Sequence, residues 1–240
     1  TLVIEGDDGY RVYVNDKEVI NYWGTHASAK REYTLKAIAG KEYKIKIEYM
    51  QAGAEAVLRF DLGIYQQIAP EAVAERVKDA DVVIFVGGIS PNLEGEEKNF
   101  VNCPGFAGGD RTSIELPEVQ RNILKALKKA GKKVIFVNCS GSAMALVPET
   151  QSCDAILQAW YPGQAGGTAV ADIIFGDYNP SGKLPVTFYK NTEQLPDFED
   201  YSMKGRTYRY MTEAPLFPFG YGLSYTTFQL SKAGLNKRVA

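Results

Sequence analysis

Three short apolar runs in the second part of the chain decide its fold: Asp81-Val-Val-Ile-Phe-Val86, Lys133-Val-Ile-Phe-Val137 and Ala155-Ile-Leu-Gln-Ala159. Runs of β-branched and aromatic residues of this length are typical of strands inside a parallel sheet. Helical patterns alternate with them and span residues 70–78, 116–130 and 166–175. This alternation predicts an α/β fold, a doubly wound (α/β) sandwich with a mostly parallel sheet and right-handed crossovers.

The ends of these segments support the same assignment. Pro70 stands where a helix begins, and Gly131 is a natural stop for the helix predicted over 116–130. A last strand is expected at Leu184-Pro-Val-Thr-Phe188, and Asn138-Cys-Ser-Gly-Ser142 is expected to start a helix. The tail after Tyr189 is rich in Pro, Gly and aromatic residues and is predicted to be irregular.

The first 63 residues follow a different period, because apolar and polar residues alternate as they do in strands. The segments concerned are 10–14, 19–20, 33–35, 43–49 and 56–60. Turn residues such as Asn15-Asp16 connect them at the short spacing of antiparallel sheets. We therefore expect a fragment of an antiparallel β-sandwich with little helix before Gly63, and three parts in all: 1–66, 67–232 and a tail at 233–240.

Composition excludes several classes of function. With 27 basic and 29 acidic residues among 240, the formal charge is -2, which argues against nucleic acid as a partner. No apolar run approaches the length of a membrane span, so no membrane contact is expected. Cys103, Cys139 and Cys153 lack metal-ligand spacing and could form at most one disulfide, and the single His26 argues against Ser-His or Cys-His catalysis. No metal and no cofactor are expected.

A long loop, Gly88 to Glu115, leaves the carboxyl end of the first parallel strand, where open α/β sheets bind ligands. It gathers three carboxylates in Leu93-Glu-Gly-Glu-Glu97 and an acid and a cation in Asp110-Arg111. A carboxyl group among other acids and partly removed from water has a raised pKa, as the general acid of glycoside hydrolysis requires. The alternative is a solvated acidic loop that Arg111 happens to balance.

Motifs along residues 67–230 resemble the C-terminal α/β sandwich domain of family 3 glycoside hydrolases, which include β-glucosidases and β-xylosidases. The stretches that carry the resemblance are Ile84-Phe-Val-Gly-Gly-Ile89, Leu93-Glu-Gly-Glu96, Gly109-Asp-Arg111, Ile114-Glu-Leu-Pro117, Ala159-Trp-Tyr-Pro-Gly-Gln164, Asn179-Pro-Ser-Gly-Lys-Leu-Pro-Val186, Gly205-Arg-Thr-Tyr-Arg-Tyr210 and Phe217-Pro-Phe-Gly-Tyr-Gly-Leu-Ser-Tyr225. Residues 1–63 are similar to a protective-antigen-like β-sandwich, on Asp7-Asp-Gly9, Arg11-Val-Tyr-Val-Asn15 and Trp23.

The resemblance implies a retaining mechanism in which an Asp on a separate N-terminal barrel attacks the sugar and a Glu of this domain serves as acid/base. That Glu falls in Leu93-Glu-Gly-Glu96; Glu94 matches the first acid of the family pattern Glu-x-Glu-Gly, and Glu96 is the alternate. Glu97 departs from the pattern, since many relatives have Gly there. Asp110 and Arg111 are expected to hold the loop or bind a sugar hydroxyl, with a structural ion pair as the equal alternative.

The sequence thus predicts part of a β-glucosidase or β-xylosidase that removes terminal β-D-glycosyl units. Its expected partners are the carbohydrate substrate and the N-terminal barrel of the same enzyme, which this chain does not encode, so the isolated chain is predicted to be inactive. The alternative is a non-catalytic carbohydrate-binding module, which would retain affinity for sugars in isolation. Nucleotide binding is disfavoured by the glycine spacing. We expect a periplasmic or secreted location.

Overall fold

The computed structural model describes residues 1–53, 56–64, 68–95, 103–232 and 234, and the chain divides into two compact units, Thr1–Ile68 and Ala69–Ala240. The boundary predicted between residues 66 and 67 falls within 65–67, outside the described residues. Of the predicted tail, 233–240, only Gly234 is described.

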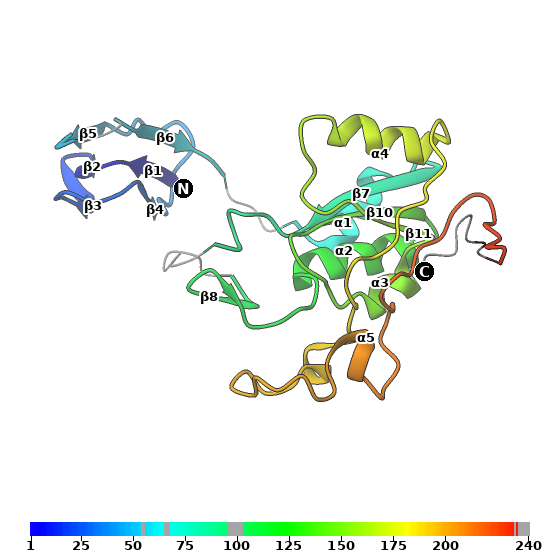
Figure 1. Cartoon of the computed structure of the whole chain (residues 1–240). Helices are drawn as coiled ribbons and strands as arrows, with labels where there is room; N and C mark the ends of the chain where they lie inside the picture. Colours follow the sequence, from blue (N-terminus) through cyan, green and yellow to red (C-terminus); the bar gives the residue numbers. More distant parts are fainter. Residues whose placement is uncertain (54–55, 65–67, 96–102, 233, 235–240) are drawn as a thin grey trace. The chain divides into compact units, whose positions relative to one another are not determined.

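The first unit consists of two three-stranded antiparallel sheets (Figure 1). One sheet has the order β4-β1-β6, with β1 at Leu2–Gly6, β4 at Ala29–Tyr33 and β6 at Leu58–Leu62. The other has the order β3-β2-β5, with β2 at Tyr10–Val14, β3 at Lys17–Tyr22 and β5 at Ile45–Tyr49. Alternate residues of these strands bury a small core of Ile4, Tyr10, Val12 and Ile20. Within its described residues the unit contains no helix.

Two details of this unit differ from the sequence pattern, and one follows it. Leu2–Gly6 was not among the predicted strands, because it lacks alternation: Leu2, Val3 and Ile4 are all buried in the central strand of its sheet. The strand expected at 33–35 lies instead at Ala29–Tyr33, on the sheet edge. The turn between β2 and β3 forms as expected, since Asn15 and Asp16 both have positive φ, 49° and 64°, as a two-residue hairpin loop requires.

The second unit is built on a three-stranded parallel sheet of order β11-β10-β7. The strands are β7 at Val82–Gly88, β10 at Lys133–Cys139 and β11 at Ala155–Gln158. Helices α1 (Pro70–Arg76), α2 (Glu118–Lys129) and α3 (Val147–Ser152) pack together, and α4 (Gly166–Phe175) lies on the other side of the sheet from α2 (Figure 1). The core contains Leu124, Leu127, Val134, Phe136 and Met144. Parallel and antiparallel sheets in one chain agree with an α/β fold in general.

One face of this sheet is open within the described part of the chain. Strand β7 was expected inside the sheet, yet it is an edge strand, and Val82, Ile84 and Val86 are 44–65% exposed. Helix α4 buries none of its residues. Parallel sheets normally have both faces covered. The described residues therefore leave part of the apolar surface of β7 uncovered.

Two other expectations are wrong. Leu184–Phe188 forms no strand among the described residues; only an isolated bridge joins Phe188 to Phe217. Pro185 removes one backbone donor, which explains part of this. Asn138–Ser142 does not begin a helix, because β10 continues to Cys139 and α3 starts only at Val147.

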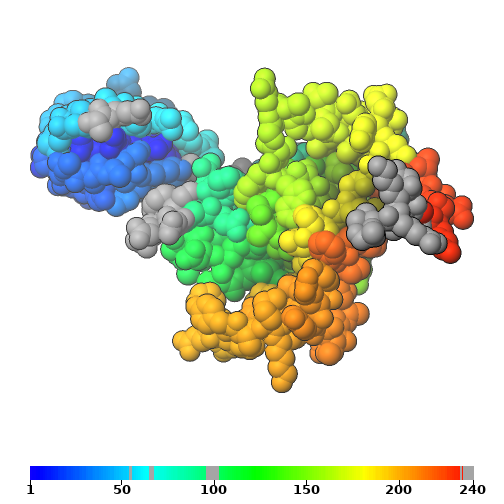
Figure 2. Space-filling model, viewed as in Figure 1, coloured from blue at the N-terminus to red at the C-terminus, as the bar shows by residue number. Residues whose placement is uncertain are grey.

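The chain after residue 190 is largely irregular, with only the short η1 (Thr192–Gln194) and α5 (Thr207–Tyr210) described there. In the space-filling view the orange part of this segment projects from the body of the second unit (Figure 2). Among the described residues, no helix is both long and apolar enough to span a bilayer.

Candidate active site

The candidate site lies where the parallel strands end. Gly87 and Gly88 close β7, and Gly88 has φ of 115°, which favours glycine. A Cβ at Gly88 would collide with the carbonyl oxygen of Cys139 on β10. The Gln120 side chain holds both backbone groups of Gly88, accepting from its N and donating to its O at 2.7 Å each. This clamp fixes the point from which the long loop departs.

Glu94 stands on the first turn of that loop. The backbone N–H groups of Leu93 and Glu94 both donate to the Ser90 carbonyl at 2.9 Å, and Gly95 N donates to Gly109 O at 3.2 Å. The Glu94 side chain is half-buried. Its Oε1 accepts from Ser142 Oγ at 3.3 Å and its Oε2 from Tyr161 Oη at 3.2 Å. Both carboxylate oxygens are therefore held by hydroxyl groups.

Arg111 supports this arrangement from a hairpin. Strands β8 (Phe106–Ala107) and β9 (Asp110–Arg111) are joined by Gly108 and Gly109, both with positive φ. The Arg111 Nη1 donates to Ser142 Oγ at 2.8 Å and to Ala143 O at 3.2 Å. Because Ser142 Oγ accepts from Arg111, its own hydrogen is free to be donated to Glu94.

Charge and burial together shift the pKa values of Arg111 and Tyr161. Burial lowers the pKa of Arg111, and the negative charge of Glu94 opposes this effect. The guanidinium still carries its charge, since arginine does not deprotonate in proteins. Burial also raises the pKa of Tyr161, and the neighbouring charge of Glu94 adds to the shift, so the phenol remains a hydrogen-bond donor. The Arg111 Nη2 is buried without a partner.

The other predicted site residues are placed differently. Asp110 is exposed on β9, and no ion pair joins it to Arg111 in the described structure, where the guanidinium uses Ser142 and two backbone carbonyls instead. The structural ion pair considered for these two residues is therefore absent. Glu96 and Glu97 lie outside the described residues.

A buried polar network lies at the ends of β10 and β11. Asn138 Nδ2 donates to Gln158 Oε1 at 2.6 Å, Gln158 Nε2 donates to Ser140 Oγ at 3.0 Å, and Ser140 Oγ donates to Ser142 O at 2.9 Å. Asn138 and Ser140 are fully buried. The network connects the sheet to the serine that contacts Glu94, so the hydroxyl is held by a rigid element.

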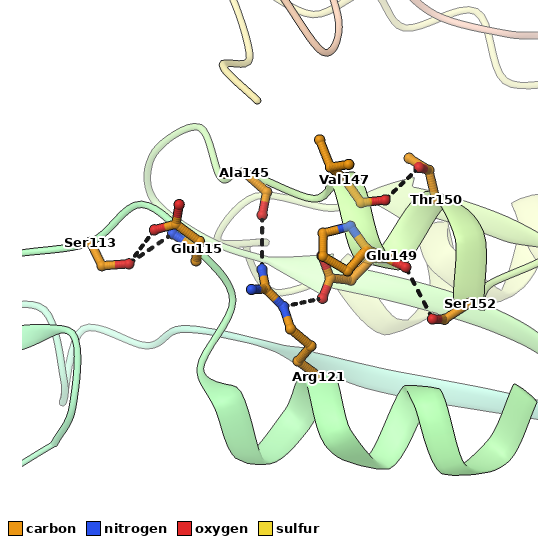
Figure 3. Close-up of polar contacts among 9 residues, drawn as sticks. Ser113, Glu115, Arg121, Ala145, Val147, Glu149, Thr150 and Ser152 are labelled. Carbon is orange, nitrogen blue, oxygen red and sulfur yellow. Dashed lines mark hydrogen bonds and ion pairs between the residues drawn. The ribbon is translucent and has the colours of Figure 1, made fainter. Parts of the chain in front are cut away.

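The other end of the loop, at Ser113 and Glu115, is held by hydrogen bonds of a carboxylate (Figure 3). The Glu115 carboxylate accepts from Ser113 Oγ, from Thr192 N at 2.9 Å and from Thr192 Oγ1 at 2.6 Å. These donors lower the pKa of Glu115 to about 2, against the opposing effect of burial. Next to it, Arg121 Nε donates to Glu149 Oε1 at 2.8 Å, and only 1% of the Glu149 side chain is exposed. Both carboxylates are structural in character.

Sequence reasoning missed the two residues that hold Glu94. Ser142 was noted only at the end of a stretch expected to start a helix, and Tyr161 only within a motif that carries the family resemblance. A signal existed for one of them, because Gly141 lies two residues after β10 ends, and glycine there permits the close approach of another side chain. What approaches it could not be read from the sequence.

Chemically, the arrangement suits a carboxyl group that changes its protonation state. A hydroxyl group donates to an ionised oxygen and accepts from a protonated one, so Ser142 and Tyr161 fit both forms of Glu94. Among the described residues, no group of three or more His, Cys, Asp or Glu side chains could hold a metal ion. The three cysteines are free thiols, and burial raises the pKa of Cys139 and, to about 12, that of Cys153.

Comparison with known proteins identifies the family. Residues 9–225 match the model of the glycosyl hydrolase family 3 C-terminal domain. The chain is 58% identical over 233 residues, 96% of its length, to "Xylan 1,4-beta-xylosidase" of Xylanibacter ruminicola, and 41% identical over 202 residues, 79% of its length, to "Periplasmic beta-glucosidase" of Salmonella typhimurium. The chain belongs to the glycosyl hydrolase family 3 C-terminal domain family.

Solved structures agree with this assignment. A β-glucosidase from Kluyveromyces marxianus superposes with a TM-score of 0.70 at 26% identity, over 95% of this chain and 29% of that one. An exo-β-xylosidase, XlnD, in complex with a xylobiose aziridine probe gives a TM-score of 0.55 at 30% identity, over 66% of this chain and 20% of that one. The chain spans about a quarter of the length of the two curated relatives, 26% and 25%.

Proposed function

We propose that this chain is part of a retaining β-glycosidase that hydrolyses terminal β-D-glycosidic bonds, with Glu94 as its acid/base. Glu94 would protonate the leaving glycosidic oxygen and later activate water, while an Asp nucleophile is supplied by an N-terminal barrel of the same enzyme. The observation that carries the proposal is the Glu94 carboxyl, held through both oxygens by Ser142 and Tyr161 at the carboxyl end of the sheet.

The position of this carboxyl supports the role. It projects from a loop that starts at the end of β7, and ligands of open α/β sheets bind at that edge. No ion pair joins Arg111 to Glu94 in the described structure, and the hydrogen bonds between them run through Ser142. A general acid must exist in the protonated form during part of the cycle, which such a pair would oppose.

The wider architecture follows from the same proposal. The second unit corresponds to a doubly wound α/β sandwich, and the first to part of a protective-antigen-like β-sandwich. Asp110 and Arg111 line or hold the catalytic loop, and Glu96 is the alternate acid/base. A periplasmic or secreted location is proposed, and one relative is named a periplasmic β-glucosidase.

Among possible substrates, β-xylosides are favoured over β-glucosides. The relative at 58% identity is named a xylan 1,4-β-xylosidase, whereas the relative named a periplasmic β-glucosidase is 41% identical. We therefore propose the non-reducing end of β-xylo-oligosaccharides as the first substrate to assay, with β-glucosides second.

The test is kinetic and uses the full-length enzyme that contains this chain. Glu94→Ala should lower kcat/KM for xylobiose by about 10²- to 10⁴-fold, because the general acid is lost. Dinitrophenyl β-xyloside, whose leaving group needs no protonation, should be affected far less at the first step. Azide should accelerate the variant and yield a β-xylosyl azide.

Control variants separate the competing assignments. Glu199→Ala changes an exposed acid of the irregular segment and should behave as wild type. If Glu94→Ala leaves the dependence on leaving group unchanged while Glu96→Ala abolishes it, the role belongs to Glu96. If the isolated chain binds xylobiose by calorimetry as tightly as the full-length enzyme, a carbohydrate-binding module is favoured instead.

A further inference from the structure

Tyr161 occupies a position that the chain reaches at a cost in backbone strain. The preceding residue, Trp160, has φ of 58°, in the left-handed region that bulky side chains rarely adopt. Such a conformation persists only where surrounding contacts enforce it, and it is concentrated at functional sites. The turn it produces directs the next side chain back over the end of β10.

Tyr161 rests there on a residue without a side chain. A Cβ at Gly141 would lie 2.7 Å from Tyr161 Cε2 and 3.5 Å from Glu94 Oε2. The distance to the ring is shorter than real Cβ contacts, whereas the distance to Glu94 Oε2 is an ordinary van der Waals contact. The backbone of Gly141 therefore serves as a platform on which the tyrosine ring lies, with its hydroxyl 3.2 Å from Glu94 Oε2.

We propose that Tyr161 is a positioning residue for Glu94, set in place by the strained Trp160 and by the open surface of Gly141. The inference rests on the proposed function of Glu94 and adds residues to it. Ser142 holds Oε1 and is fixed by Arg111, so the Tyr161 hydroxyl is the contact that fixes rotation of the carboxyl about its last bond. With Tyr161 in place, one oxygen of Glu94 is directed consistently at the substrate.

The anchoring of Trp160 explains why the strain is tolerated. Its ring packs edge-on against the fully buried Phe188, with centroids 6.0 Å apart. Ala159 N donates to Asn138 O at 2.9 Å, which ties the preceding residue to β10. These contacts hold the turn, while the Tyr161 ring is 38% exposed and its hydroxyl contacts Glu94.

The first experiment removes only the hydroxyl. In the full-length enzyme, Tyr161→Phe should lower kcat for xylobiose by about 10- to 100-fold, the effect of losing one hydrogen bond to a charged group, with KM little changed. For dinitrophenyl β-xyloside the glycosylation step should be nearly unaffected. A purely structural role would lower both substrates equally.

A second variant displaces the ring and leaves the hydroxyl in the chain. Gly141→Ala should reproduce the kinetic pattern of Tyr161→Phe, and the double variant should be no worse than either single one. Gly163→Ala is the matched control, because a Cβ at Gly163 meets nothing within 4 Å. Circular dichroism and melting temperature establish that each variant is folded.

A double-variant cycle separates this inference from the proposed function. If Glu94 is the acid/base and Tyr161 acts through it, adding Tyr161→Phe to Glu94→Ala should cause no further loss. A full multiplicative loss in that background, or wild-type kinetics for Tyr161→Phe alone, overturns the role of Tyr161 even if Glu94→Ala behaves as predicted. Unchanged leaving-group dependence in Glu94→Ala overturns the proposed function itself.

Discussion

The two ends of the long loop hold carboxylates in opposite ways. Glu94 receives one hydroxyl at each oxygen, at 3.3 and 3.2 Å. Glu115 receives donors from Ser113 and twice from Thr192, and its pKa falls to about 2. Close to Glu115, the buried Glu149 is paired with Arg121 (Figure 3). One end holds its carboxylate with a single hydroxyl at each oxygen, and the other holds its carboxylates with several donors or an ion pair.

This difference separates Glu94, the carboxyl proposed for catalysis, from Glu115 and Glu149, the carboxylates that stabilise the fold. A permanently ionised, multiply hydrogen-bonded carboxylate stabilises the fold but cannot serve as a general acid near neutral pH. A carboxyl with neutral, adaptable partners contributes little to stability but remains able to exchange its proton. Substitutions at the two ends of the loop test this contrast, and the largest effect is given first. The stability variants all carry Trp23→Phe, so that fluorescence of Trp160, the remaining tryptophan, reports on unfolding of the second unit.

The largest effect is expected at the buried ion pair. Glu149→Ala leaves the Arg121 guanidinium, 19% exposed, without its charged partner. Loss of one member of a buried pair costs about 3–5 kcal/mol, measured here by urea unfolding followed through Trp160 fluorescence. The double variant Arg121→Met, Glu149→Leu should regain at least half of the lost free energy of unfolding, because no unpaired charge remains. A loss below about 1 kcal/mol in the single variant would show that water already solvates the pair.

A smaller, pH-dependent effect is expected at Glu115. Its pKa in the folded chain, about 2, is below the ordinary value of 4.5, so its stabilising contribution is complete above about pH 5 and is lost as pH falls toward 2. Solvent screening of a partly exposed group limits the contribution to about 1–2 kcal/mol. Glu115→Gln should therefore be less stable at pH 7 and lose less stability between pH 5 and pH 3. Parallel curves for the two proteins would refute the assignment.

The matched control for that experiment is another acid on the same segment. Glu118 is exposed in the first turn of α2, and Glu118→Gln removes a charge without removing a multiply bonded carboxylate. Its stability should differ from the parent by a few tenths of a kcal/mol, the usual effect of a charge near a helix start. A pH dependence equal to that of Glu115→Gln would mean that net charge, and not the Thr192 contacts, controls acid stability.

A feature of the fold or the site could be predicted from the sequence where it depends on residues that are close together along the chain. The parallel strands and α4 follow from local periodicity, and α4 was predicted over the residues it occupies, 166–175. The loop was singled out because it is too long and too acidic for a simple connection, and Glu94 within it because it matches the first acid of the family pattern. The edge position of β7 was not readable, because an apolar strand has the same sequence whether or not a neighbour covers it.

The partners of these carboxylates lie beyond any local pattern. Tyr161 is 67 residues from Glu94, and Thr192 is 77 residues from Glu115. The positive φ of Trp160 runs against the preference of its side chain, so no propensity rule predicts it. Such departures from local rules are expected at functional sites, and here the departure lies at the residue before Tyr161, which is proposed to position Glu94.

The smallest effect on stability is expected at the site itself. Glu94→Gln keeps one carbonyl oxygen to accept from a hydroxyl and offers an amide to the other, so the free energy of unfolding should remain within about 0.5 kcal/mol of the parent. Urea unfolding of this chain at pH 7 measures it beside Glu115→Gln. In the full-length enzyme the same substitution removes the proton donor and should abolish most turnover of xylobiose. A loss of 2 kcal/mol or more would instead make Glu94 a structural clamp of the kind that Glu115 provides, and the distinction between the two ends of the loop would disappear.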